Sequence, residues 1–171
     1  MQTHFDLFHL PAAFDLDVDR LEAAYKEVQG QVHPDRFAHA GDAEQRQAAQ
    51  WATRANEAYQ TLKSPFNRAC YLLELRGVHA LDARNTAMPP VFLMQQMEAR
   101  ETLAEVAAGA DLDALERLER DAKTQAAALM QEIAGLFQTH GNDAALVEAL
   151  RKYRFLDKFL ADIGAAYDTI G

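Results

Sequence analysis

Apolar residues recur at helical spacing along most of the chain, and this pattern predicts an all-α protein. Steps of three and four residues are typical of a helix that buries one face. Two such stripes lie in the first part of the chain, separated by a short polar break. The first stripe consists of Val18, Leu21, Tyr25, Val28 and Val32, and the second of Ala48, Ala52, Ala55, Tyr59 and Leu62.

The break between the stripes contains residues 33–36, with the sequence His-Pro-Asp-Arg. Proline lacks an N–H and disfavours helical backbone in the residue before it, so the first helix is expected to end at Val32 or His33. Asp42 followed by Gln45 predicts an N-cap with its reciprocal partner at the start of the second helix. We therefore expect an antiparallel helix pair whose connecting loop holds the tripeptide in solvent.

His33, Pro34 and Asp35 allow more than one interpretation from chemistry alone. Ordinary turn residues that end a helix would account for them. Catalysis is poorly supported, because Pro34 separates the imidazole from the carboxylate and no nearby Ser or Cys completes a nucleophile–base pair. Metal binding is also poorly supported, because the other histidines show no ligand spacing. These histidines are His4, His9, His39, His79 and His140.

The rest of the chain predicts one short helix and then three long ones. The short helix follows Ser64-Pro65 and ends near Gly77, and residues 78–90 are the least periodic stretch. Short connections between the long helices favour antiparallel neighbours and hence an up-down three-helix bundle. The first long helix is expected to start at Pro90 or Val91 and to end near Gly109. The second is expected to run from Asp113 to Thr139, and the third from beyond Asn142 nearly to Ile170. The predicted organisation is residues 1–77, a linker at 78–89 and a bundle at 90–171.

The first bundle helix is apolar on two faces. At 100° per residue, a core stripe contains Phe92, Gln96, Ala99, Leu103 and Val106. A second face mixes apolar side chains with carboxylates, and Phe155 lies well away from the core stripe of the third helix. Such patches usually mark a partner surface, and Met suits adaptable contacts, although a wide bundle core or the first domain would also cover them. The second face carries Leu93, Met94, Met97, Glu98, Glu101 and Glu105.

Composition narrows the function classes. The single Cys70, expected to be a small buried hydrophobe, excludes internal disulfides and cannot hold an iron–sulfur cluster alone. No apolar run is long enough to span a membrane, and the polar start is not a signal peptide, so we expect a cytoplasmic protein. The formal charge is -9, and both halves are acidic, which argues against nucleic-acid binding. We therefore predict no cofactor, no resident metal, no nucleic acid and no membrane.

Two resemblances give these features a function. Residues 5–11 and 55–62, on either side of the His-Pro-Asp loop, resemble the first and third helices of a J domain. Residues 92–101 and 154–158 resemble the carboxy-terminal domain of HscB-type co-chaperones, the J proteins of iron–sulfur cluster biogenesis. Together the resemblances cover essentially the whole chain. They imply an N-terminal J domain followed by a scaffold-binding three-helix bundle, in a bacterial-type protein that lacks the cysteine-rich extension of some eukaryotic relatives.

The resemblance implies a co-chaperone rather than an enzyme. It would stimulate the ATPase of a heat-shock-70-class chaperone (HscA-like) and deliver an IscU-type scaffold to it. The alternative is a general J-domain protein that presents unfolded clients. A more distant alternative is a small helical enzyme or ligand carrier that uses His33, Asp35 and Cys70. The second helix is less basic than is usual in J domains. Expected chaperone contacts are His33, Pro34, Asp35, Arg36, Lys26 and Arg20, and expected scaffold contacts are Leu93, Met94, Met97, Glu98, Glu101, Glu105 and Phe155.

Overall fold

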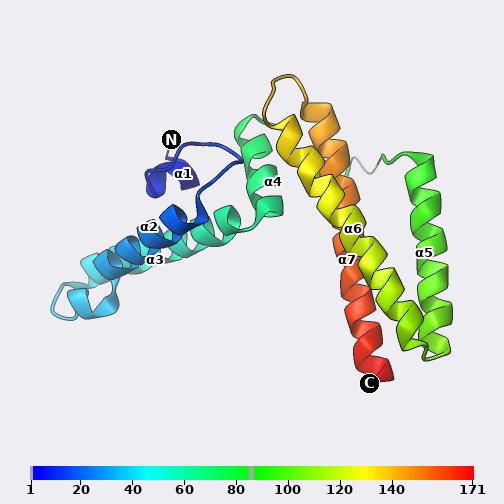
Figure 1. The fold of residues 1–171 in the computed structure, drawn as a ribbon. Helices are drawn as coiled ribbons and strands as arrows, with labels where there is room; N and C mark the ends of the chain where they lie inside the picture. The colour runs from blue at the N-terminus through cyan, green and yellow to red at the C-terminus, as the bar shows by residue number, and fades with distance from the viewer. Residues whose placement is uncertain (1, 85–86) are drawn as a thin grey trace. The chain divides into compact units, whose positions relative to one another are not determined.

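The computed structural model describes residues 2–84 and 87–171, which contain helices and no strand, so the predicted all-α class is confirmed (Figure 1). The chain divides into two compact units, Met1–Arg76 and Gly77–Gly171. The segment predicted as a linker, residues 78–89, therefore falls within the second unit; its Asn85 and Thr86 lie outside the described residues. Across the described ranges, no helix has the length and apolar character needed to cross a bilayer.

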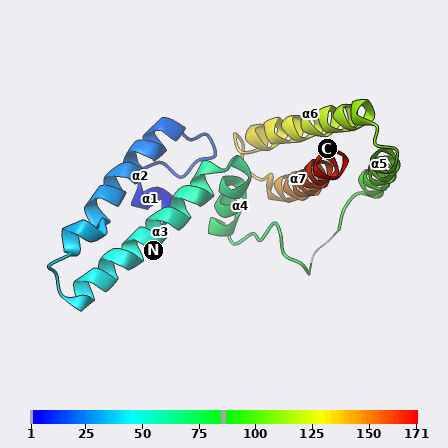
Figure 2. The same ribbon diagram turned by 90° about the horizontal axis from the view of Figure 1, so that it is seen from below.

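The first unit is built on a long antiparallel pair, α2 and α3, which lie side by side (Figure 2). Its interior is formed by fully buried side chains from several helices, including Phe5, Leu21, Leu62 and Leu73. The first helix is a single turn with a capping box at Thr3, much shorter than the 5–11 segment that suggested it. The elements are α1 (His4–Leu7), α2 (Val18–Val32), the 3₁₀ turn η1 (Pro34–Phe37), α3 (Asp42–Lys63) and α4 (Pro65–Leu75).

The start of α3 corrects one prediction. Its N-cap is Gly41, and Asp42 lies inside the first turn, so the expected cap of Asp42 with Gln45 does not form. The Gln45 side chain turns back to the loop instead, and its Nε2 donates to the carbonyl oxygens of Phe37 at 3.0 Å and Ala40 at 3.3 Å. Because the helix already begins at Asp42, this residue cannot act as its cap, which spacing alone does not reveal.

The second unit is an up-down bundle of three helices, as predicted (Figure 1). Its helices are α5 (Pro90–Ala108), α6 (Leu112–Leu136) and α7 (Asp143–Ile170). The prediction for the middle helix was wrong at its end, because α6 stops three residues before Thr139. There the Asn142 side chain donates to the Leu136 carbonyl at 3.3 Å, and Gly141 has a φ of +81°, which favours glycine.

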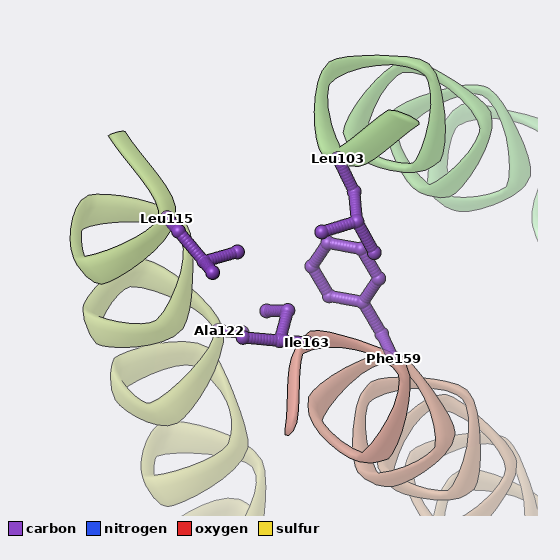
Figure 3. Packing of buried hydrophobic residues seen from close by; sticks show 5 residues of the cluster. All are labelled: Leu103, Leu115, Ala122, Phe159 and Ile163. Atoms are coloured by element: carbon purple, nitrogen blue, oxygen red, sulfur yellow. The ribbon is translucent and has the colours of Figure 1, made fainter. Parts of the chain in front are cut away.

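All three bundle helices contribute to one apolar cluster (Figure 3). Leu103 of α5 and Phe159 of α7 meet near Ile163, which faces Leu115 and Ala122 of α6. The predicted α5 core stripe is confirmed, since Gln96 and Leu103 are buried and Phe92, Ala99 and Val106 are partly buried. An ion pair between Arg100 and Asp162, at 2.7 Å, ties α5 to α7 at the edge of this cluster.

Candidate functional site

The His-Pro-Asp loop is a 3₁₀ turn that begins where α2 ends, at Val32 as predicted. The Asp35 backbone N–H donates to His33 Nδ1 at 3.2 Å, and the Arg36 N–H donates to the His33 carbonyl at 3.0 Å. Because Nδ1 accepts a hydrogen bond, the imidazole proton lies on Nε2. Asp35 Oδ2 is 3.6 Å from Nδ1, which is too long for a hydrogen bond to a nitrogen that is already accepting.

Both polar side chains of the loop face solvent. The His33 side chain is 59% exposed and the Asp35 side chain 93% exposed. The loop backbone is nevertheless held in place, since Gln45 of α3 bonds two of its carbonyls and the Ala40 N–H donates to the Phe37 carbonyl at 3.0 Å. The structure therefore presents one donor and one carboxylate on a well-supported turn.

The three cations predicted to contact the chaperone lie at different distances from this loop. Arg36 belongs to the loop, and Lys26 lies about 10 Å from its start at 1.5 Å per residue of helix. Arg20, in the first turn of α2, lies about 20 Å away by the same measure. All three are exposed, but Arg20 and Lys26 project from α2 about 120° apart. The structure thus brings Arg36 to the loop, and Lys26 near it, but not Arg20.

The second predicted surface lies on the bundle, and its apolar residues are exposed. Met94 is 61% and Met97 63% exposed, whereas Leu93 and Phe155 are 37% and 36% exposed. The carboxylates of Glu98, Glu101 and Glu105 are exposed on the same helix. We call the four apolar residues Leu93, Met94, Met97 and Phe155 the apolar patch.

Contacts between α5 and α7 bring the two parts of the apolar patch together. The rings of Phe92 and Phe155 meet edge to face with centroids 6.0 Å apart, and Leu93 is next to Phe92 in the chain. Lys152 Nζ lies 5.7 Å from the centre of the Phe92 ring. Together with the Arg100–Asp162 ion pair, these contacts fix α5 against α7, so Phe155 lies against the residue that precedes Leu93 in the chain.

A hollow beside Phe155 was not predicted from the sequence. Leu81 and Met88, from the segment before α5, line it together with Phe155, Arg154 and Lys158 of α7. Periodicity gives no signal for Leu81 and Met88 because they lie outside any helix. On α7, however, residues 151, 154, 155 and 158 follow an i, i+3, i+4, i+7 pattern. This spacing places them together on one face of the helix, beside the core stripe.

Comparison with known proteins decides the family. A protein-family model described as "HSCB C-terminal oligomerisation domain" matches residues 88–164. The co-chaperone protein HscB homolog of Ralstonia nicotianae is 53% identical over 168 residues, which cover 98% of this chain and 96% of the relative. The chain belongs to the HscB family of co-chaperones. It is therefore a co-chaperone of an HscA-type chaperone in iron–sulfur cluster assembly, and not an enzyme.

Solved structures of HscB proteins agree with this fold over nearly the whole chain. Chaperone HscB from Vibrio cholerae matches with a TM-score of 0.86 and 33% identity, covering 99% of this chain and 100% of the other. Human co-chaperone protein HscB also matches with a TM-score of 0.86, at 27% identity, covering 96% of this chain and 82% of the other. The predicted fold, an N-terminal J domain followed by a C-terminal helical bundle, is confirmed.

Proposed function

We propose that this HscB protein joins an HscA-like ATPase to an IscU-type iron–sulfur scaffold through two separate surfaces. Residues 1–77 would act as the J domain, 78–89 as the linker and 90–171 as the scaffold-binding bundle. The observation that carries the proposal is the apolar patch, which exposes four large side chains on the faces of α5 and α7 turned away from the bundle core. Such patches mark partner surfaces.

The His-Pro-Asp loop supplies the chaperone contact in this proposal. The exposed Asp35 carboxylate accepts a charge-assisted hydrogen bond from an arginine of the ATPase, and His33 donates from Nε2. Pro34 and the support from Gln45 lower the cost of ordering the loop on docking. Arg36 and Lys26 add attraction to an acidic chaperone surface, with Arg20 a weaker and more distant contributor.

The apolar patch and its carboxylates supply the scaffold contact. Leu93, Met94, Met97 and Phe155 are anchors of the kind that dominate interface energies, and the exposed carboxylates of Glu98, Glu101 and Glu105 favour a basic surface on the scaffold. The Phe92–Phe155 contact and the Arg100–Asp162 ion pair hold α5 and α7 against each other, while the methionine side chains of the patch stay adaptable. Anchors on two helices of fixed spacing suit a folded partner better than an extended, unfolded client.

Titration of the purified IscU-type scaffold of the same organism tests the proposal. The triple variant Leu93→Ala, Met94→Ala and Phe155→Ala is expected to bind the scaffold well over tenfold more weakly than the wild type, because central anchors often contribute upwards of about 2 kcal/mol each. Leu112→Ala removes an exposed leucine from α6 and serves as the matched control. It should leave the affinity unchanged.

The same titration separates the proposal from general client presentation. A permanently unfolded polypeptide, added as a competitor, should not displace the folded scaffold from the wild-type chain. Efficient displacement at comparable concentrations would favour a general J-domain protein that presents unfolded clients. Unchanged affinity of the triple variant would show that the scaffold binds elsewhere.

A further inference from the structure

The hollow beside Phe155 has a volume of about 450 Å³ and an apolar interior. Its apolar lining includes Leu81 and Met88, from the segment before α5, and Phe155 of α7. Arg154 and Lys158, one turn of α7 apart, contribute their exposed cationic side chains. The hollow is continuous with the apolar patch, because Phe155 belongs to both.

A buried arginine of α7 holds the segment before α5 in place. Arg151 is only 9% exposed, and its Nε donates to the Ala80 carbonyl at 2.9 Å while Nη1 lies 3.4 Å from the Ala87 carbonyl. Burial of a guanidinium is unfavourable unless its donors are satisfied, so these bonds hold the segment before α5 against α7. Arg151 thus acts as a positioning residue for the hollow rather than as part of its exposed rim.

The rim carries positive charge that the chain itself does not neutralise. Within residues 2–84 and 87–171, neither Arg154 nor Lys158 forms an ion pair with a carboxylate. Asp82, the only carboxylate that lines the hollow in the described ranges, is bound by Arg84 through contacts of 3.1 and 3.3 Å. Across the apolar patch, α5 presents carboxylates instead. The cationic pair Arg154 and Lys158 therefore faces the hollow, although the exposed Asp157 lies between them in the sequence, and the carboxylates Glu98, Glu101 and Glu105 lie on α5.

We propose that this hollow is a second subsite of the scaffold-binding surface, which takes an apolar side chain and an adjacent carboxylate of the same folded scaffold. The proposal rests on the proposed function, because the subsite continues the apolar patch at Phe155. Its apolar walls favour an apolar anchor, and its two unneutralised cations favour a carboxylate. The cationic rim at Arg154 and Lys158 and the carboxylates of α5 then favour one orientation of the scaffold on the bundle.

Charge reversal at the rim tests the subsite in the full-length chain. Arg154→Glu with Lys158→Glu is expected to weaken binding of the purified IscU-type scaffold at least tenfold at low salt. The matched control is Arg117→Glu with Arg120→Glu, which makes the same change in net charge at two exposed positions of α6. The control should bind within about twofold of the wild type. All four positions are exposed, so thermal unfolding of both variants should match the wild type.

A neutral variant checks the apolar part of the hollow. Met88→Ser removes apolar surface from its wall without changing charge and is expected to weaken scaffold binding several-fold. Full affinity in both the charge-reversal variant and Met88→Ser would overturn the subsite. Equal weakening by the α6 control would also overturn it, because general attraction between charges would then explain the result.

The outcomes also separate the subsite from the proposed function. If the triple variant of Leu93, Met94 and Phe155 loses binding while the charge-reversal variant and Met88→Ser bind normally, the subsite alone is overturned. Normal binding in all of these variants overturns both, because the scaffold would then bind another surface.

Discussion

The two candidate surfaces of this HscB protein differ in size, polarity and stiffness. The His-Pro-Asp loop is small and polar, and backbone hydrogen bonds and the Gln45 side chain support it. The apolar patch spans two helices, and its methionines, more than 60% exposed, keep much of their side-chain freedom. The loop suits a contact that depends on the exact position of two polar groups, and the patch suits an adaptable contact that gains from burying area.

The largest expected effect comes from the loop. His33→Gln removes the imidazole whose Nδ1 accepts from the Asp35 backbone N–H, and it should abolish stimulation of the chaperone's ATPase. His39→Gln, at an exposed position a few residues away, is the matched control and should stimulate normally. Helicity and scaffold affinity should be unchanged in both. Normal stimulation by His33→Gln would remove the loop from the mechanism.

The second prediction separates the apolar patch from the bundle core. Leu103→Ala truncates a side chain that packs against Phe159, and should lower the free energy of unfolding by about 2–5 kcal/mol. Met97→Ala, on the same helix, should lower it by less than about 0.5 kcal/mol because its side chain is largely in solvent. Chemical denaturation followed by circular dichroism measures both. A comparable loss in the two variants would place Met97 in the core.

Salt should weaken the contact between the first unit and the chaperone. Stimulation through the loop should weaken as salt rises, and Lys26→Ala should lower the association rate with the chaperone by a few-fold at low salt. Arg20→Ala should have a smaller effect, because Arg20 lies farther along α2. Stopped-flow association at several salt concentrations measures both variants. An effect of Arg20→Ala as large as that of Lys26→Ala would contradict the placement argued from α2.

The smallest expected effect is a pH dependence confined to the first unit. Burial lowers the pKa of His4, which stacks on Tyr71 with ring centroids 4.3 Å apart, while nearby Glu57 opposes this shift. The unfolded chain therefore binds the proton more readily, so stability should fall as the pH drops through the usual histidine range near 6.5. We expect the thermal midpoint to fall by no more than about 3 °C.

The fluorescence of Trp51, the only tryptophan in the chain, reports unfolding of the first unit. His4→Phe keeps an aromatic ring in the stack and should remove most of the pH dependence. His140→Gln, in the second unit, is the control for removal of a histidine and should retain the pH dependence. A pH dependence that survives in His4→Phe would have to arise from other groups.

Periodicity predicted the elements of the fold well, because long amphipathic helices repeat apolar residues at every third or fourth position. The core stripe on α5 and the end of α2 before Pro34 followed from spacing and backbone sterics. The predicted cap of α3 was wrong because the helix begins one residue earlier than expected, with Gly41 as its cap. The last turns expected for the middle bundle helix were wrong because Asn142 and Gly141 terminate it earlier.

The candidate sites were less accessible to sequence reasoning. Helical geometry placed the exposed side chains of the apolar patch correctly on the surface, although their role in scaffold binding remains a prediction. The hollow beside Phe155 depends on Arg151 bonding carbonyls about seventy residues earlier in the chain, a long-range contact that no local pattern encodes. The distances of Arg20 and Lys26 from the loop, by contrast, follow from the rise of the predicted helix alone.

The central claim is that the loop and the apolar patch act as separate binding surfaces. Its most direct test is the steady-state ATPase rate of the HscA-type chaperone with this protein, measured with and without the scaffold. Without scaffold, the Leu93, Met94 and Phe155 triple alanine variant should stimulate as the wild type does. With scaffold at a concentration that saturates the wild type, the variant should show none of the additional stimulation. Full additional stimulation by the variant, or loss of its stimulation without scaffold, would contradict the account.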